Sequence, residues 1–478
     1  GITTGTGENV CVGSYAGWKV TTGAQNVLVG DNAGSQAALT GLANTIIGDN
    51  AGLWISSGGY NVAVGGNALD ANTTASNNVA VGYAALGANT TGASNTAIGA
   101  SAMAATTTGG NSVAVGNNAL DAMTTANFNT AVGLNALTAN TTASQNVAVG
   151  NHALEANTTA ASNTAVGSFA LRVNTTGAYN TAVGGLALDA NTTAANNTAV
   201  GYDALTANTT GSQNASVGSY SLDANTTGAN NVAVGINALS ANTTAGSNVA
   251  VGINALLVNT TGASNTGIGA FALDANTTGA NNTAIGINAG TATTTGAQNV
   301  MLGALAGQTL TTGTYNVYIG YNNNPSAVDV ANEIVIGNGN LTGKGGSTGF
   351  ISPAGGAMYN GQNSTVWVAT SDRRIKKDIV PNTKGLAAIN QIEPMNFYYK
   401  SDEELQEELP GVKDDFPLNK LTTSAIAQEL ELIFPEAIER RGEHDIMSVN
   451  TDPIFWSMIN AIKELSAKVT ELEDKLNG

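Results

Sequence analysis

The sequence predicts an all-β solenoid of 17-residue coils, followed by a small domain of a different kind. A Val/Ile-Gly pair recurs at a spacing of 17 residues from Val12-Gly13 to Ile336-Gly337. Gly, Asn and Thr are frequent in every repeat, and these residues disfavour a helix. Charged residues become much more frequent after residue 370. A short fixed period is the signature of a solenoid in which each coil stacks on its neighbour.

The repeat is regular enough to place every coil. The apolar residue before the glycine falls at position 47 and then every 17 residues up to 336. One step is longer, because Val29 and Ile47 are 18 residues apart, so one residue is inserted between Asp31 and Asn44. With neighbouring strands ~4.8 Å apart, twenty coils would make a rod of roughly 95 Å.

Each coil has the local chemistry of a strand and turns. In the unit 129–145, the Thr-Ala-Val sequence of 130–132 has β-branched residues at alternate positions and predicts a short strand that ends at the glycine. We expect a second short extended piece at 136–137. The Asn-Thr-Thr sequence of 140–142 is typical of a turn, because Asn tolerates left-handed backbone and can bond its own backbone. Eleven such triplets also match the N-glycosylation pattern, but their period is explained by turns alone.

Such a thin rod buries little apolar surface, so we expect three chains to pack side by side. The sequences Asn-Val-Ala-Val-Gly of 61–65 and 146–150 and Ser-Val-Ala-Val-Gly of 112–116 resemble the Ser-Val-Ala-Ile-Gly signature of the collagen-binding heads of trimeric autotransporter adhesins. Those heads are trimeric, left-handed parallel β-rolls with shorter coils. The resemblance implies a trimeric, left-handed parallel β-roll for residues 1–340.

A second domain begins at residue 371. Residues 1–370 hold 3 of the 16 Lys and Arg residues and 12 of the 33 Asp and Glu residues, so most charges follow. The segments 370–379, 385–400 and 425–436, with the closing apolar helix, closely resemble the C-terminal intramolecular chaperone of phage tail fibres and tailspikes. The resemblance implies a small α+β domain over 371–478 that trimerises, templates the folding of the preceding fibre and then cuts itself off.

In that family the nucleophile is a serine and the base a lysine five residues later, which fall on Ser371 and Lys376. A serine hydroxyl is a weak nucleophile until a base takes its proton, and a lysine is such a base only if burial keeps it neutral. Attack on the preceding carbonyl would cut between Thr370 and Ser371. The expected activity is a single-turnover serine endopeptidase acting on its own chain. By itself this pair is a weak signal, and the basic run 373–377 is equally compatible with a solvated domain edge.

The last segment predicts a coiled coil over 454–477, with apolar residues spaced alternately 3 and 4 apart. The heptads alone favour two strands, whereas the family resemblance calls for three. The alternative is an amphipathic helix packed on its own domain. The seam consists of Phe455, Met458, Ile462, Leu465, Val469, Leu472 and Leu476.

Between the two domains, residues 341–370 lose the period and form a tip or linker. Its aromatic residues Phe350, Tyr359 and Trp367 can contact a receptor once cleavage exposes this end. They can equally cover the last coil, because solenoid ends need capping.

Composition excludes several functions. A net charge of −17 argues against nucleic-acid binding. The sequence contains no run of 18 apolar residues, so we expect no membrane insertion. One Cys and two His cannot build a metal cluster or a disulfide framework within one chain, and we expect no cofactor. Asp70, Asp121 and their equivalents share one column of the repeat but lie several coils apart. We therefore expect a solvated edge and not the acid and base pair of a polysaccharide depolymerase.

Two functions remain. The first is a homotrimeric tail fibre of a phage virion, extracellular, whose tip binds a host cell-surface receptor or glycan. The second is a bacterial surface adhesin with the same chaperone. We expect an anchor or virion-attachment domain ahead of Gly1.

Overall fold

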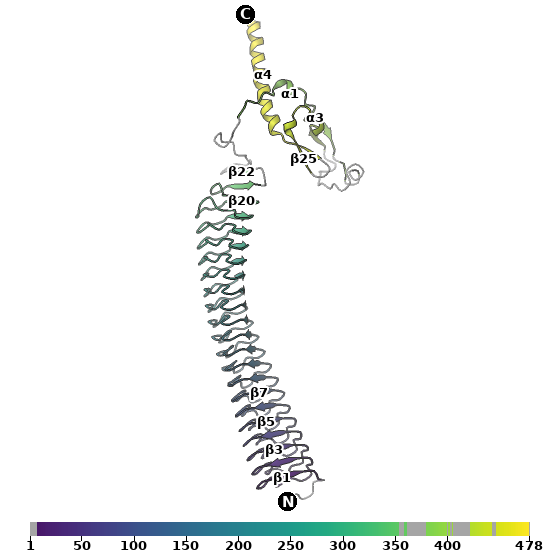
Figure 1. Ribbon diagram of the computed structural model, residues 1–478, viewed down its shortest axis with the longest axis vertical. Helices are drawn as coiled ribbons and strands as arrows, with labels where there is room; N and C mark the ends of the chain where they lie inside the picture. The colour runs from purple at the N-terminus through teal and green to yellow at the C-terminus, as the bar shows by residue number, and fades with distance from the viewer. Residues whose placement is uncertain are drawn as a thin grey trace. The chain divides into compact units, whose positions relative to one another are not determined.

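The computed structural model describes residues 7–352, 358–360, 379–398, 400–401, 404, 421–441 and 446–477. The chain divides into two compact units, Gly1–Thr370 and Ser371–Gly478. The first unit is a parallel β-solenoid of stacked coils (Figure 1), as the sequence predicts. Its coils each contribute one short strand: β1 (Val10–Val12), β2 (Val27–Val29), β3 (Thr45–Ile47), β4 (Val62–Val64), β5 (Val79–Val81), β6 (Thr96–Ile98), β7 (Val113–Val115), β8 (Thr130–Val132), β9 (Val147–Val149), β10 (Thr164–Val166), β11 (Thr181–Val183), β12 (Thr198–Val200), β13 (Ala215–Val217), β14 (Val232–Val234), β15 (Val249–Val251), β16 (Thr266–Ile268), β17 (Thr283–Ile285), β18 (Val300–Leu302), β19 (Val317–Ile319) and β20 (Ile334–Gly337).

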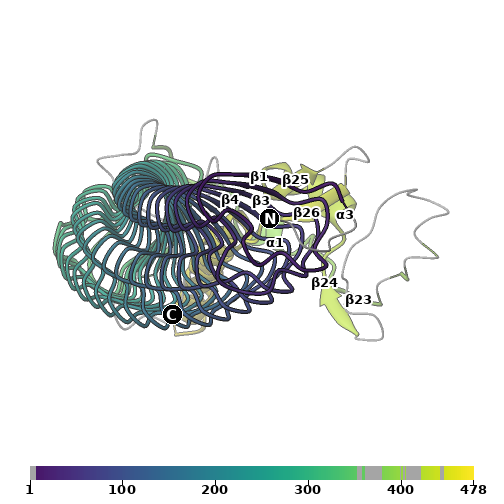
Figure 2. The same cartoon turned by 90° about the horizontal axis from the view of Figure 1, so that it is seen from below.

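Every strand pairs in parallel with the strand of the next coil, residue for equivalent residue. Thr130 of β8 lies opposite Val147 of β9, for example. The coils rotate progressively along the shaft (Figure 2). On both sides of the extra residue in the 18-residue step, hydrogen bonds join neighbouring coils in the regular register. Gln36 N–H donates to Leu53 O on one side, and Thr40 N–H donates to Ser56 O on the other. The inserted residue is therefore accommodated between Gln36 and Thr40, inside the predicted interval.

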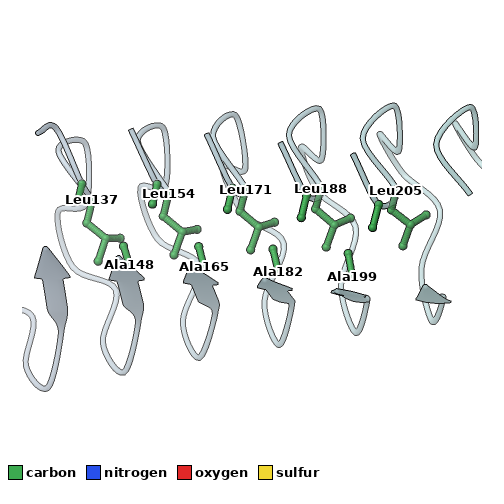
Figure 3. Close-up of a cluster of buried hydrophobic side chains, with 14 of the residues drawn as sticks. Leu137, Ala148, Leu154, Ala165, Leu171, Ala182, Leu188, Ala199 and Leu205 are labelled. Carbon is green, nitrogen blue, oxygen red and sulfur yellow. The ribbon is translucent and has the colours of Figure 1, made fainter. Parts of the chain in front are cut away.

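The core is a ladder of small residues against a ladder of leucines. Ala131 and the alanines equivalent to it point inward from the strands and are fully buried, as are Leu137 and the leucines equivalent to it. Figure 3 shows Leu154 and Leu171 extending from one wall toward Ala165 and Ala182 on the other. Alanine is short enough to let the opposite wall approach, which leaves a thin, filled interior.

The prediction of an extended piece at 136–137 is wrong. Asn135 and Leu137 have φ values of +54° and +53°, so this segment is a turn with two left-handed residues and not an extended piece. The turn puts the Leu137 side chain into the core and lets its N–H bond Ala153 O of the next coil at 3.0 Å. Those gains offset the cost of left-handed backbone in a residue with a Cβ, roughly 1–2 kcal/mol.

The strand glycine is required by the close stacking of coils. Gly150 has a φ of +142°, and a Cβ there would lie 2.4 Å from Gly167 O of the next coil. Asn140, in the Asn-Thr-Thr turn, does not have positive φ but donates from Nδ2 to Ala143 O at 3.0 Å. Its side chain is fully buried, so the triplets serve the turn, as the sequence suggested.

The sheet continues past residue 340, where the 17-residue period ends. Strand β21 (Gly349–Ser352) pairs in parallel with β20 at a step of 15 residues, with Ile334 opposite Gly349. Strand β22 (Met358–Asn360) then pairs antiparallel to β21. A reversed strand cannot begin another coil, so the stacking direction ends there.

The second unit contains helices α1 (Leu386–Ile389), α3 (Ala427–Glu431) and α4 (Asp452–Asn477), with a 3₁₀ turn, η2 (Pro435–Ala437). Strands β23 (Met395–Phe397) and β24 (Thr422–Ser424) form one antiparallel pair, and β25 (Ile438–Arg441) and β26 (Ile446–Val449) form another. A small core lies under α3 and η2, made of Leu430, Phe434 and Ala437. Among the described residues, no helix is both long and apolar enough to span a membrane.

Candidate functional site

The predicted catalytic residues lie just outside the described part of the chain. Ser371 and Lys376, the predicted scissile bond Thr370-Ser371 and Trp367 all fall within 361–378. The described chain resumes at Ile379, three residues after Lys376. What the structure does define is how the segment that follows is held.

That segment, 382–386, is clasped by one polar face of helix α4. Asn382 Nδ2 donates to Ser457 Oγ at 3.0 Å. Asn460 Nδ2 donates to Asn382 O at 2.8 Å, and Glu464 Oε2 accepts from Leu386 N–H at 3.0 Å. Spacings of three and four residues place Ser457, Asn460 and Glu464 on the same face of a helix.

Lys384 binds the same segment to the small core. Its Nζ lies 2.9 Å from Glu436 Oε2 and 4.6 Å from the centre of the Phe434 ring, and donates to Ile433 O. Desolvation raises the pKa of Glu436, but the hydrogen bond and charge of Lys384 outweigh it and hold that pKa below its ordinary value. The segment is therefore fixed by ionic and polar contacts on two sides.

The opposite face of α4 is apolar and unpaired within the described part of the chain. The exposed fractions of the seam side chains run from 41% at Met458 to 89% at Leu476. The helix is thus present over the predicted segment, and its seam is left exposed by the residues that the structure describes. Large exposed apolar stripes mark interaction surfaces.

Part of the second unit is similar to a known family. Residues 371–439 match the family model described as chaperone of endosialidase, a peptidase family. No curated protein matches the chain. The match begins at Ser371, where the second unit begins. A β-solenoid shaft followed by a chaperone of endosialidase domain fits a tail-fibre-like protein.

The far end of the shaft holds a buried carboxylate that sequence reasoning missed. Glu333 occupies the column of the first Asn of each coil, and its N–H bonds Asn316 Oδ1 at 2.8 Å. Its fully buried carboxylate accepts from Tyr318 Oη at 3.1 Å, Ser326 N–H at 3.1 Å and Gly345 N–H at 2.8 Å. The signal was in the sequence, because Glu333 stands in a column that is otherwise Asn, or Ser at position 112, but its partners come from irregular segments.

Of the three aromatic residues proposed for receptor contact, the structure describes Phe350 and Tyr359. Phe350 is 6% exposed and belongs to the shaft core, with Lys344 Nζ 4.7 Å from its ring centre. Tyr359 lies opposite Phe350 in the pairing of β21 with β22. The position of Phe350 agrees with the capping alternative.

The acidic column of the shaft does not bring its carboxylates together. The nearest carboxylates of the column are two coils apart, or roughly 10 Å, which is the upper limit of the about 5–10 Å between paired catalytic carboxylates. These are Asp121, Glu155, Asp189 and Asp223, whereas Asp70 and Asp121 are three coils apart. Burial raises the pKa of Asp70 and of Asp121. Asp189 is bound by Arg172 through two hydrogen bonds of 2.9 and 3.0 Å. These contacts suit a structural edge.

Proposed function

We propose that this chain is the subunit of a homotrimeric fibre, a tail fibre of a phage virion, whose C-terminal domain directs trimer folding and then removes itself. The observation that carries the proposal is the match to the chaperone of endosialidase family directly after a solenoid shaft. The start of the match, the boundary between units and the bond selected from sequence all fall at Thr370-Ser371.

The regularity of the shaft supports the need for such a chaperone. Equivalent residues of successive coils are nearly identical, so two chains can slip past each other by one coil and lose the contacts of one coil in twenty. The repeats therefore define the register between chains weakly. A C-terminal domain that associates first through the exposed seam of α4 would fix it.

The cleavage chemistry follows from the two proposed residues. Lys376, as the neutral amine, takes the hydroxyl proton of Ser371, and Oγ attacks the Thr370 carbonyl carbon. The peptide C–N bond breaks, the proton passes to the released amine of Ser371, and an ester joins Thr370 to Oγ. Water then hydrolyses this ester, giving the Thr370 carboxylate and restoring the hydroxyl.

Intact mass of the freshly expressed chain tests the proposal. The wild type should split into 1–370 and 371–478, whereas Ser371→Ala should stay full length and still form trimers by light scattering. Lys376→Ala should slow cutting, and the adjacent Lys377→Ala is the matched control that should cut normally. An uncut wild type would overturn the peptidase role and leave a permanent trimerisation domain.

The extracellular location and the host-surface receptor or glycan belong to this proposal. The alternative, a bacterial surface adhesin, is favoured by the Val-Ala-Val-Gly strands that resemble adhesin heads. Cells of a candidate host distinguish the two: a phage fibre should adsorb to bacteria and block infection, whereas an adhesin should not compete with any phage.

A further inference from the structure

The outer face of the shaft sheet carries an apolar ladder that the fold leaves uncovered. In each strand the middle side chain points into the core and the two flanking ones point outward. The third strand position is Val, Ile or Leu in all twenty coils. This outer ladder consists of Val12, Val29, Ile47, Val64, Val81, Ile98, Val115, Val132, Val149, Val166, Val183, Val200, Val217, Val234, Val251, Ile268, Ile285, Leu302, Ile319 and Ile336.

These side chains are not buried within the single chain. Val149 and Val200 are 36% exposed, and Ile98 is 41% exposed. A column that faces only water tolerates polar residues, as the residue after the strand glycine shows: it is Asp49, Tyr83, Asn117 or Ile236 in different coils. The outer ladder admits none in twenty coils, which indicates that something apolar covers it.

We propose that the outer ladder is the surface on which the chains of the fibre pack against one another. This inference rests on the proposed homotrimer and assigns its interface to the strand face and not to the Asn-Thr-Thr edge.

The occupant follows from the period of the ladder. The ladder repeats its side chains at one strand spacing along twenty coils. Only a surface with the same rise and the same rotation per coil can contact it along its whole length, and another copy of this chain is such a surface. Charge agrees, because the outward strand positions of β1 to β20 contain no charged residue, so chains of net charge −17 can meet there without repulsion.

The area is also sufficient. Two outward side chains per coil, exposing on the order of 40 Å² each, give roughly 1,500 Å² per chain, above the ~800 Å² per partner of a stable interface. Because successive coils rotate (Figure 2), chains that follow the ladder wrap around one another.

Thiol labelling tests the assignment without threatening the fold. In a Cys11→Ser background, Val149→Cys is compared with Thr142→Cys, an exposed position of the turn edge. In the assembled fibre, maleimide should modify Cys at position 149 at least about tenfold more slowly than at 142, because covered thiols are inert. After denaturation both should react equally.

A trimeric fibre in which both positions react at the same rate, or in which position 142 is the protected one, would overturn this inference and leave the proposed trimer intact. A monomeric wild type by light scattering would instead overturn the trimer and the interface together. A second readout is the oligomeric state of the cleaved shaft after four lysine substitutions. The shaft should dissociate when lysine replaces Val149, Val166, Val183 and Val200. It should stay assembled when lysine replaces Thr142, Thr159, Thr176 and Thr193.

Discussion

Asn163 joins its own coil to the coils before and after it through its backbone N–H and its side chain. Its N–H bonds Asn146 Oδ1 at 2.9 Å, its Nδ2 donates to Gly177 O at 3.0 Å, and its Oδ1 accepts from Asn180 N–H at 2.8 Å. Every group in this chain of contacts is buried. A column of asparagines therefore satisfies backbone groups that the short strands leave without partners.

Asn163→Ala should destabilise the shaft by about 2–4 kcal/mol, because a buried N–H and a buried carbonyl each lose a partner. Asn163→Ser should cost about half of that. Ser112 occupies the same column and its Oγ still accepts from Asn129 N–H at 3.2 Å. Urea unfolding followed by circular dichroism measures both losses, and equal losses would contradict the role of the acceptor oxygen.

Glu333→Ala should loosen the end of the shaft, since three donors lose their acceptor at a cost of roughly 1–3 kcal/mol each. Hydrogen exchange at the Ser326 and Gly345 amides should accelerate while exchange in the middle coils stays unchanged. Asp329→Ala removes the same charge from an exposed position and is the control. Unaltered exchange in Glu333→Ala would show that the carboxylate does not hold this end.

At the scale of elements, a coil contacts only the coils before and after it. Strand β9 pairs with β8 and β10, and stability of such arrays is a sum of coil and neighbour contributions. Deleting residues 129–145, one whole coil, should preserve the fold and shift the melting temperature little. Deleting 129–136, half a coil, should unfold the adjacent coils. Melting followed by circular dichroism compares the two, and similar losses from both deletions would refute independent coils.

In the second unit, acid should weaken the contacts around segment 382–386. The pKa of Glu436 is lowered from 4.5 in the folded state, so the stability it contributes is complete above that value and is lost as pH falls through the folded pKa. Glu436→Gln should reduce the loss of stability on acidification from pH 7. The measurement is urea unfolding of the uncut Ser371→Ala chain across pH, and an unchanged pH profile in the glutamine variant would count against the Lys384 contact.

For the whole molecule, a shaft of equivalent coils folds locally but does not specify how chains align. Helix α4 presents one face to segment 382–386 and an exposed apolar seam outward, and in the proposed homotrimer this seam is the surface that meets other copies. In the proposed homotrimer, association at one end would be followed by growth along the outer ladder and would give a single register.

Expression of residues 1–370 alone should therefore give shafts with mixed register. We expect broad oligomer distributions by native mass spectrometry and light scattering, where the full chain gives one species. The Ser371→Ala chain, which keeps the C-terminal unit attached, is the control. Uniform, soluble trimers from 1–370 would show that the shaft aligns itself.

The sequence by itself determined the coil length, the strands, the inserted residue and the helix over the last segment, because these depend on local pattern and period. Ser371 and Lys376 came from family resemblance and stay predictions, since the described residues do not include them. Tertiary structure alone decided the left-handed backbone of Leu137, the burial of Glu333 and Phe350, and the clasp of segment 382–386 on α4. Each depends on groups that lie far away in sequence: the facing wall, the irregular end coils, or a helix some 75 residues later. A repeating pattern says which residues share a column, but only the folded chain shows what each column faces.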